Sequence, residues 1–551
     1  MERGTLELII KTINDYSKRK LTLEFKLRCD GAGEFPSEVI RELVSGDIGL
    51  HLVFIPEEFG GLGGSAYDIY RVSAALAGAD LGIATAFLAI SLGMDPISVG
   101  GTPEQKEKWI GAVASEGLIV AYGVTEPTAG SEVSSIRTTA ERITDAKGRT
   151  VSYRLNGTKQ FITNASVADL YTILARAPEG PSFFVIEKGA QGLGAGRHED
   201  KHGIRASNTA QVILEDVIVP AGNLVGGVEG QGLRHAQEVF GFTRLMVAAF
   251  GLGAGTAALR RAIAYSKERV QYGSPLCRKQ GYMHRLIVPN AVRLEAARTY
   301  IEAVATKLDA GQKGLETEGA IAKYFATEAG NEAAEAAIQA HGGYGYMREY
   351  EVEKIKRDVR ITTIYEGTSE IMLSTIGMDR WRSTIQSRFG TYAGLEDRML
   401  TLETCCSGVG ARHVALASRI LNETLKVAFR EKLTRKQFIL FKLAEMMAAV
   451  ESAASLCERA RLVQEGQGDG AASLFTDGAA QPGLIPAMAR LHARSAAQTV
   501  LMNANLAVAG TGVLEAARVA EFRRENGFEK LLDAAEGSEA DMDFVSECIC
   551  A

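Results

Sequence analysis

Apolar residues recur at helical spacing along most of the chain. Over residues 6–121 they stand three and four positions apart with few β-branched runs, which predicts a helical domain covering residues 1–120. Residues 81–92 are apolar on nearly every side, so this helix is expected to be buried or to line an apolar cavity. Residues 61–66 have the form GxGxxA, but a second helical pattern follows them instead of a βαβ unit. We therefore interpret them as a loop between helices.

The pattern changes at Ile119, where short strand-like runs separated by turn residues begin. They predict a small antiparallel β domain over residues 121–231. Its strands are expected near residues 119–124, 152–155, 171–175, 182–187 and 210–214. Residues 198–202 of this domain spell HExxH, which binds zinc when it lies on a helix. Because glycines and strands flank the motif, we expect a loop here and no metal site.

Helical spacing returns at residue 232 and continues to the end of the chain. Residues 232–382 predict a four-helix bundle, in which Gly251 and Gly255 allow two helices to approach closely. Residues 383–551 predict an additional helical domain. Its helices are expected over residues 399–423, 425–462 and 484–509, with a glycine-rich hinge at residues 466–470. The expected fold is therefore mainly α with a central β domain.

Composition excludes several kinds of partner. A net charge of −6 gives no general attraction to nucleic acid. The uncharged apolar runs at residues 81–94 and 245–259 are shorter than the roughly 18 to 20 residues of a spanning helix, so no integral membrane segment is expected. Peripheral contact of residues 383–551 with a membrane stays open. The first residues lack a secretory signal and the seven cysteines show no disulfide framework, so a cytoplasmic location is expected.

One carboxylate stands in a favourable sequence, Tyr365-Glu366-Gly367-Thr368. A Glu followed at once by Gly and Thr can be held where a helix breaks into a loop, with its backbone close to a ligand. That arrangement suits a general base. Taken alone, the pair Glu366-Gly367 is more simply interpreted as a surface turn with a solvated carboxylate.

The surrounding residues change that interpretation. Residues 339–349 read QAHGGYGYMRE, and Lys354 and Asp358 follow at fixed spacing. Together with residues 358–371 they resemble the C-terminal signature of the acyl-CoA dehydrogenases. These are flavoenzymes that oxidise a fatty acyl thioester to its 2-enoyl form.

Two further stretches resemble the same family. Residues 122–132, YGVTEPTAGSE, match its second signature except at Glu132, where Asp is usual. Residues 383–551 resemble the extra helical domain of its very-long-chain branch.

The resemblance implies FAD as the cofactor and an acyl-CoA as the substrate. In relatives, several matching residues reach across a dimer interface to the neighbour's FAD. They correspond to Arg269, Gln280 and the segment from Gln339 to Gly343 of this chain. The implied cofactor-binding residues are Tyr122, Val124, Thr125, Phe161, Thr163, Arg269, Gln280, Gln339, Gly343, Thr368 and Glu370. The implied substrate-binding residues are Ser131 and Arg244 near the CoA moiety, Tyr365 and Gly367 beside Glu366, and Ala84 and Leu88 near the floor of the acyl pocket.

The expected reaction removes two hydrogens from the acyl chain. The α-proton of a thioester is weakly acidic, so its removal needs a nearby base and stabilisation of the developing enolate oxygen. We expect Glu366 to take that proton while flavin N5 accepts the β-hydride. One branch of the family places its base near position 243, which is Thr243 here and cannot do this work.

The resemblance also implies partners. Electrons would pass to electron-transfer flavoprotein, and the enzyme would be a homodimer. Two alternatives stay open from the sequence: a flavin acyl-CoA oxidase or monooxygenase on the same fold, and a non-catalytic scaffold or assembly relative. The length and branching of the acyl chain are not determined by the sequence.

Overall fold

The computed structural model of the chain describes all residues except 468–471, 477–480 and 533–534, and leaves the side chains of residues 240–242 undescribed. Packing divides the described chain into two compact units. The first unit is Met1–Ala254 with Lys354–Thr362, and the second is Gly255–Glu353 with Thr363–Ala551. The four-part division drawn from the sequence stays a prediction.

The first unit opens with the expected helices. They are α1 (Arg3–Lys20), α2 (Leu23–Ala32), α3 (Ser37–Val44), α4 (Ala66–Ala79), α5 (Leu81–Gly100) and α6 (Pro103–Glu116). Residues 61–65 of the GxGxxA stretch are a loop, as predicted, and Ala66 begins α4. The Ser65 hydroxyl caps that helix by accepting a hydrogen bond from the Asp68 N–H at 3.3 Å.

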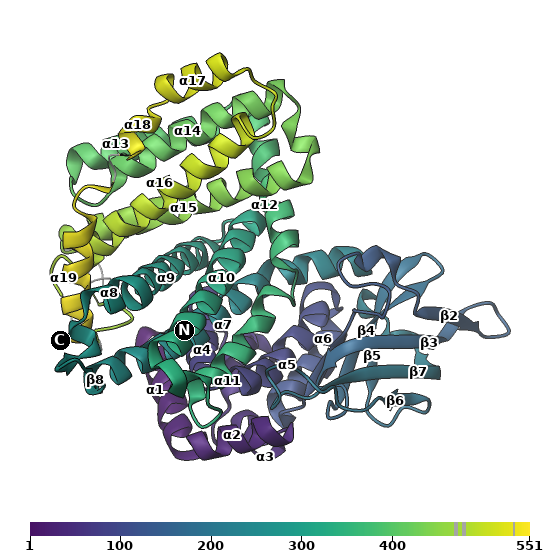
Figure 1. Ribbon diagram of the computed structural model, residues 1–551. Helices are drawn as coiled ribbons and strands as arrows, with labels where there is room; N and C mark the ends of the chain where they lie inside the picture. Colours follow the sequence, from purple (N-terminus) through teal and green to yellow (C-terminus); the bar gives the residue numbers. More distant parts are fainter. Residues whose placement is uncertain (468–471, 477–480, 533–534) are drawn as a thin grey trace. The chain divides into compact units, whose positions relative to one another are not determined.

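Helix α5 is buried along most of its length, as its sequence predicted. Asp80 begins it by accepting a hydrogen bond from the Ile83 N–H at 3.0 Å. The helix continues past the predicted end at residue 92 and includes Pro96. It packs on the sheet of the same unit, where the Thr172 hydroxyl donates to the Gly93 carbonyl at 2.9 Å (Figure 1).

The sheet of the first unit follows α6. Its strands are β1 (Val120–Gly123), β2 (Thr139–Thr144), β3 (Thr150–Thr163), β4 (Leu170–Ala177), β5 (Gly180–Glu187), β6 (Leu193–Ala195) and β7 (Thr209–Pro220). Their order is β1-β4-β2-β3-β7-β6, with β5 paired to β4. The prediction of an antiparallel sheet is wrong for two pairs, because β1–β4 and β2–β4 are parallel. Alternating apolar residues mark a strand but not its direction, so the sequence pattern could not show that the sheet is mixed.

Two of the described helices, α5 and α7 (Gly232–Glu268), are long and apolar enough to cross a membrane by length and composition alone. Of an apolar stretch of 18 residues in each, 78% and 94% is buried inside the protein, as in the core helices of a soluble domain. Helix α7 crosses the division between the units, which falls after Ala254.

A buried group of charges fastens α11 (Glu351–Val359) within the first unit. The Lys354 ammonium lies 2.7 Å from Asp80 and 2.6 Å from Asp358. Asp358 also accepts a hydrogen bond from the Ile204 N–H at 2.6 Å. Burial and the neighbouring Asp80 raise the pKa of Asp358 to about 6, although Lys354 opposes them. Lys354 and Asp358, whose spacing marked the signature, therefore link α11 to the start of α5 and to a loop of the β domain.

In the residues that the structure describes, the regular secondary structure of the second unit is helical apart from the short strands β8 (Val270–Gln271) and β9 (Ser274–Pro275). Its helices after α7 include α8 (Gln280–Tyr282), α9 (Val288–Asp309), α10 (Glu316–His341), α12 (Ser369–Gln386), α13 (Gly390–Cys405), α14 (Ala411–Arg430), α15 (Gln437–Gln464), α16 (Leu484–Val508), α17 (Ala516–Glu525), α18 (Phe528–Leu532) and α19 (Ser538–Cys550). Close packing at Gly255 is confirmed, because a Cβ added there would stand 2.6 Å from the Gly330 Cα of α10.

Two of the helices expected in the C-terminal extension are broken. The predicted helix over residues 399–423 is interrupted between α13 and α14, where Gly408 and Gly410 have φ of 81° and 88°. The one over residues 425–462 is interrupted at Lys432, with φ of 54°. A left-handed residue ends a helix even where the apolar spacing continues. The helix over residues 484–509 is confirmed as α16, and residues 468–470 of the predicted hinge lie outside the described chain.

Ion pairs connect the C-terminal helices to the others of the second unit. Glu451 of α15 accepts from Arg380 of α12 at 2.8 Å and from the Tyr392 hydroxyl at 3.0 Å. Burial raises the pKa of Glu451, but Arg380 lowers it further, so the net direction is downward. The residue is therefore a half-buried carboxylate paired with a guanidinium.

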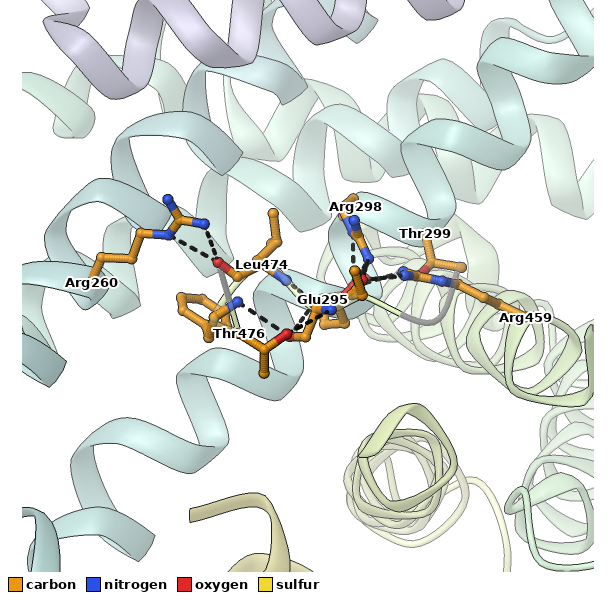
Figure 2. A network of polar contacts seen from close by, with 10 residues as sticks. Arg260, Glu295, Arg298, Thr299, Arg459, Leu474 and Thr476 are labelled. Atoms are coloured by element: carbon orange, nitrogen blue, oxygen red, sulfur yellow. Dashed lines mark hydrogen bonds and ion pairs between the residues drawn. The ribbon is translucent and has the colours of Figure 1, made fainter. Parts of the chain in front are cut away.

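Glu295 of α9 is a buried carboxylate that binds Ser473 and Leu474, which lie between α15 and α16 (Figure 2). Arg459 of α15 lies 2.7 Å from it, and Arg298 is also paired with it. The Leu474 N–H and the Ser473 hydroxyl each donate to Glu295 at 2.9 Å. Burial raises the pKa of Glu295, but the two guanidiniums and the Leu474 N–H lower it to about 2.

We predict that Glu295→Gln destabilises the protein by about 3–5 kcal/mol, because it leaves the buried Arg459 and the half-buried Arg298 short of a counter-charge. The folded-state pKa lies below the unfolded value of about 4.3. The stabilisation is thus fully present above that value and is lost as the pH falls toward about 2.

Urea unfolding of wild type and Glu295→Gln between pH 3 and pH 7 measures this effect. The difference in the free energy of unfolding between the two proteins should narrow as the pH falls below about 4. The control is Glu465→Gln, which removes the exposed partner of Arg461 and should change stability by less than about 1 kcal/mol. A gap that is absent at pH 7, or that grows with acid, contradicts the assignment.

Candidate active site

Glu366 stands in a loop immediately before α12, as the sequence predicted. Its φ is 53° and that of Gly367 is 90°, so two consecutive residues have left-handed backbone. Gly367 adopts this conformation at no steric cost, whereas a residue with a Cβ pays about 1–2 kcal/mol. Such strain persists only where neighbouring groups hold the backbone in place.

The neighbouring groups come from α12 and α10. The Thr368 side chain accepts from the Ile371 N–H at 3.3 Å and starts α12. Lys323 of α10 donates to the Gly367 carbonyl at 2.6 Å, and the Ser369 hydroxyl donates to Glu328 of α10 at 2.5 Å. The sequence interpretation did not find Lys323 or Glu328. The signal it offered was a lysine among apolar positions of a buried helix.

A first set of predicted cofactor residues lies at the ends of β1 and β3 in the first unit. Tyr122 is in β1, Val124 and Thr125 follow that strand, and Thr163 ends β3. The Gln160 N–H donates to the Thr125 carbonyl at 2.8 Å. The structure therefore brings together the two flavin-facing segments that the resemblance implied.

Phe161 owes its position to an irregularity in β3. Lys159 pairs with Val212 and Ile162 with Ala210, so the β3–β7 register shifts between them. Phe161 has φ of 58° and its side chain is 64% exposed. The extra residue turns an aromatic ring out of the strand to a position where a planar ligand could stack on it.

A buried ion pair supports this edge of the sheet. The Lys159 ammonium is 0% exposed and lies 2.8 Å from Glu126 and 3.2 Å from the Val124 carbonyl. Burial lowers the pKa of Lys159 to about 8 against the opposing effect of Glu126. Glu126 also accepts from the Arg137 N–H at 2.6 Å. The pair fixes the backbone before Thr125.

A second set of predicted cofactor residues lies in the second unit. The exposed Arg269 follows α7, and its guanidinium lies 6.0 Å from the centre of the Tyr344 ring. Tyr344 belongs to the 3-10 helix η8 (Gly342–Tyr346), which begins just after Gln339 and includes Gly343. The structure therefore brings Arg269 beside the segment that carries Gln339 and Gly343.

Gln280 has partners that the resemblance did not imply. Its side-chain amide donates to Glu539 at 2.9 Å and to Asp543 at 3.1 Å, both in α19. Asp543 also lies 3.0 Å from the His284 imidazole. To bind a cofactor as predicted, the Gln280 side chain would have to give up its hydrogen bonds to Glu539 and Asp543 or make a further one beside them.

The remaining predicted site residues are distributed over both units. Thr368 and Glu370 lie at the start of α12, next to Tyr365 and Gly367. In the first unit, Ser131 is exposed in the loop after β1 and Arg244 is half-buried in α7. Ala84 and Leu88 are buried in α5.

The HExxH motif is a loop, as predicted. It lies between β6 and β7, where His198 is 3.1 Å from the Ser207 carbonyl and 2.9 Å from the Lys201 ammonium. Across the part of the chain that the structure describes, no group of three or more His, Cys, Asp or Glu side chains is arranged to hold a metal.

The residues present fit a flavin nucleotide in their chemistry. Phe161 offers an exposed aromatic face, and the half-buried Thr125 and Thr163 offer hydroxyls beside it. Arg269 is exposed, and its guanidinium has donors that match a diphosphate.

The chain matches family models along its catalytic portion. The acyl-CoA dehydrogenase N-terminal, middle and C-terminal domains match residues 5–117, 121–217 and 230–379. The acyl-CoA dehydrogenase of Bacillus subtilis (strain 168) is 38% identical over 375 residues, which are 66% of this chain and 94% of that relative. A subunit of the caffeyl-CoA reductase–Etf complex of Acetobacterium woodii is 34% identical over 377 residues, 67% of this chain and 96% of the relative.

A solved structure also matches the C-terminal helices. It is an acyl-CoA dehydrogenase complexed with FAD from Bacillus anthracis, with a TM-score of 0.83 at 22% identity, covering 100% of this chain and 95% of that one. This likeness shows a shared fold through the additional domain. From its three matched domains and its identity to curated relatives, this chain belongs to the acyl-CoA dehydrogenase family.

Proposed function

We propose that this protein is an FAD-dependent acyl-CoA dehydrogenase in which Glu366 is the catalytic base. The observation that carries the proposal is the Glu366 loop. Glu366 has left-handed backbone, and α10 binds the two sides of the loop, through Lys323 to the Gly367 carbonyl and through Glu328 to the Ser369 hydroxyl. In a chain of this family, such a fixed carboxylate fits the removal of a proton at a defined position. The product would be a trans-2-enoyl-CoA.

Two groups of the Glu366 loop would act on the thioester. The carboxylate would take the α-proton, and the Glu366 N–H would donate to the thioester oxygen as negative charge develops there. Left-handed backbone sets the direction of this N–H relative to the side chain. Bound FAD would supply the acceptor for the β-hydride.

We propose that the protein is a homodimer. Each FAD would be held by the first set of residues of one subunit and by the second set of its partner. Exposed aromatic side chains around Arg269 support a covered surface there, because Tyr272 is 98% and Tyr346 is 79% exposed. Arg269 and the segment from Gln339 to Gly343 would then bind the FAD of the partner subunit.

Electron-transfer flavoprotein is the acceptor that we propose, and fatty acid β-oxidation the pathway. The relative from an Etf complex supports that acceptor. Location in the cytoplasm stays a prediction from the sequence, as does the absence of an integral membrane segment. The acyl chain that the enzyme prefers has to be measured.

The proposal predicts that acyl-CoAs of one chain class bleach the oxidised flavin of the purified protein under anaerobic conditions. Glu366→Gln should keep FAD and bind the same ligands, but should be bleached about 10²- to 10⁴-fold more slowly, because it lacks the base. Glu431→Gln, an exposed change in the C-terminal extension, is the matched control and should behave as wild type.

Two results would contradict this proposal. Near-normal bleaching of Glu366→Gln would remove Glu366 from the mechanism. A colourless wild-type protein that takes up no added FAD would remove the enzymatic function. Rapid oxygen consumption with acyl-CoA would instead identify an oxidase on the same fold.

We also predict that Arg269→Met weakens FAD binding. Loss of a hydrogen bond to a charged group costs about 1.5–3 kcal/mol, which corresponds to about tenfold to a hundredfold in the dissociation constant. Absorbance of the retained flavin after dialysis measures the effect. Arg278→Met is the control, since Arg278 is also exposed and lies nine residues further along the chain. Equal flavin loss in the two variants would show a general charge effect instead of a specific contact.

A further inference from the structure

Lys323 is a buried cation close to the proposed base. Its side chain is 0% exposed within α10, and its ammonium donates to the Gly367 carbonyl at 2.6 Å. Removing an ammonium from water is costly, so a lysine is kept in such a place only where its contacts compensate. A charge-assisted hydrogen bond to a carbonyl is stronger than one between neutral groups.

The carbonyl that Lys323 holds belongs to the residue immediately after Glu366. Glu366 and Gly367 both have left-handed φ. This backbone is strained at Glu366, which has a Cβ, so the loop would relax if no contact held it in place. Fixing the Gly367 carbonyl fixes the orientation of the peptide planes around it. The direction of the Glu366 side chain depends on those planes.

A second contact fastens the other side of the same turn. The Ser369 hydroxyl donates to Glu328 at 2.5 Å, and Ser369 is the first residue of α12. Lys323 and Glu328 both belong to α10, which packs against α12 within the second unit. One rigid helix therefore supplies both anchors of the loop.

We infer that Lys323, supported by Glu328 through Ser369, is a positioning residue that holds Glu366 in its reactive orientation. This inference rests on the proposed function of Glu366. Lys323 does not touch substrate in this scheme. It acts through the Gly367 carbonyl, so its loss should lower the rate of proton removal while the binding of CoA ligands is retained.

The test is the anaerobic rate of flavin reduction by a saturating acyl-CoA in the holoenzyme of Lys323→Met. We expect a rate about 10- to 100-fold below wild type, because a displacement of about 1 Å can cost a hundredfold. The dissociation constant of the product enoyl-CoA should change by less than about threefold, as expected when only transition-state contacts are lost. Lys323→Arg, which keeps a cationic donor, should recover part of the rate.

Other variants separate positioning from simple destabilisation. Ser369→Ala removes the second anchor and should lower the same rate by a smaller factor, with ligand binding retained. Lys307→Met, an exposed change near the end of α9, should leave rate and binding unchanged. If Lys323→Met is not recovered as a folded flavoprotein, Lys323→Gln, which keeps a neutral donor, is measured in its place.

A readout without turnover tests the same claim. Hydrogen exchange of the amides of residues 363–371 should be faster in Lys323→Met than in wild type, and unchanged in Lys307→Met. If wild-type flavin is reduced by no acyl-CoA, the proposed function fails, and this exchange experiment still decides whether Lys323 holds the loop. Wild-type reduction rates in the Lys323 variant, or a slow rate with an equal loss of ligand binding, would overturn the inference.

Discussion

The left-handed backbone at Glu366 is the constraint on which the proposed site depends. A residue with a Cβ pays to adopt it, and the cost is met by contacts that come from one helix. Lys323 holds the carbonyl that follows the carboxylate, and Glu328 holds the hydroxyl that opens α12. The proposed base, fixed in this way, would need no reorganisation when a substrate binds, and preorganisation of this kind makes a catalytic group effective.

Buried charges perform a comparable task elsewhere in each unit. In the first, Lys354 joins Asp80 of the α5 start to Asp358. In the second, Glu295 binds Ser473 and Leu474, and the half-buried Glu451 links α15 to α12. Ion pairs of this kind contribute little net stability compared with apolar packing, but breaking one is costly, so they specify which helices must pack together. The additional helices are therefore fastened within the second unit by specific contacts.

Local patterns in the sequence predicted what local physics determines. Helical spacing predicted the buried α5, and the flanking glycines predicted a loop at His198 despite its zinc-like spelling. Features that depend on distant residues were missed. The outward turn of Phe161 requires a register shift against β7, and the direction of β1 is set by pairing with β4. The contact of Gln280 with Asp543 joins residues 263 positions apart, so no local pattern could reveal it. The family resemblance indicated Glu366 as the catalytic base, which stays a prediction, but it did not indicate the contact of Lys323 with the Gly367 carbonyl.

A crystal structure of the holoenzyme with a bound, unreactive CoA thioester would test the central claim most directly. The account predicts the Glu366 carboxylate about 3–3.5 Å from the thioester α-carbon. It also predicts that the Glu366 N–H points to the thioester oxygen and that Lys323 remains bonded to the Gly367 carbonyl. A Glu366 side chain directed away from the α-carbon, or another carboxylate in its place, would contradict the account.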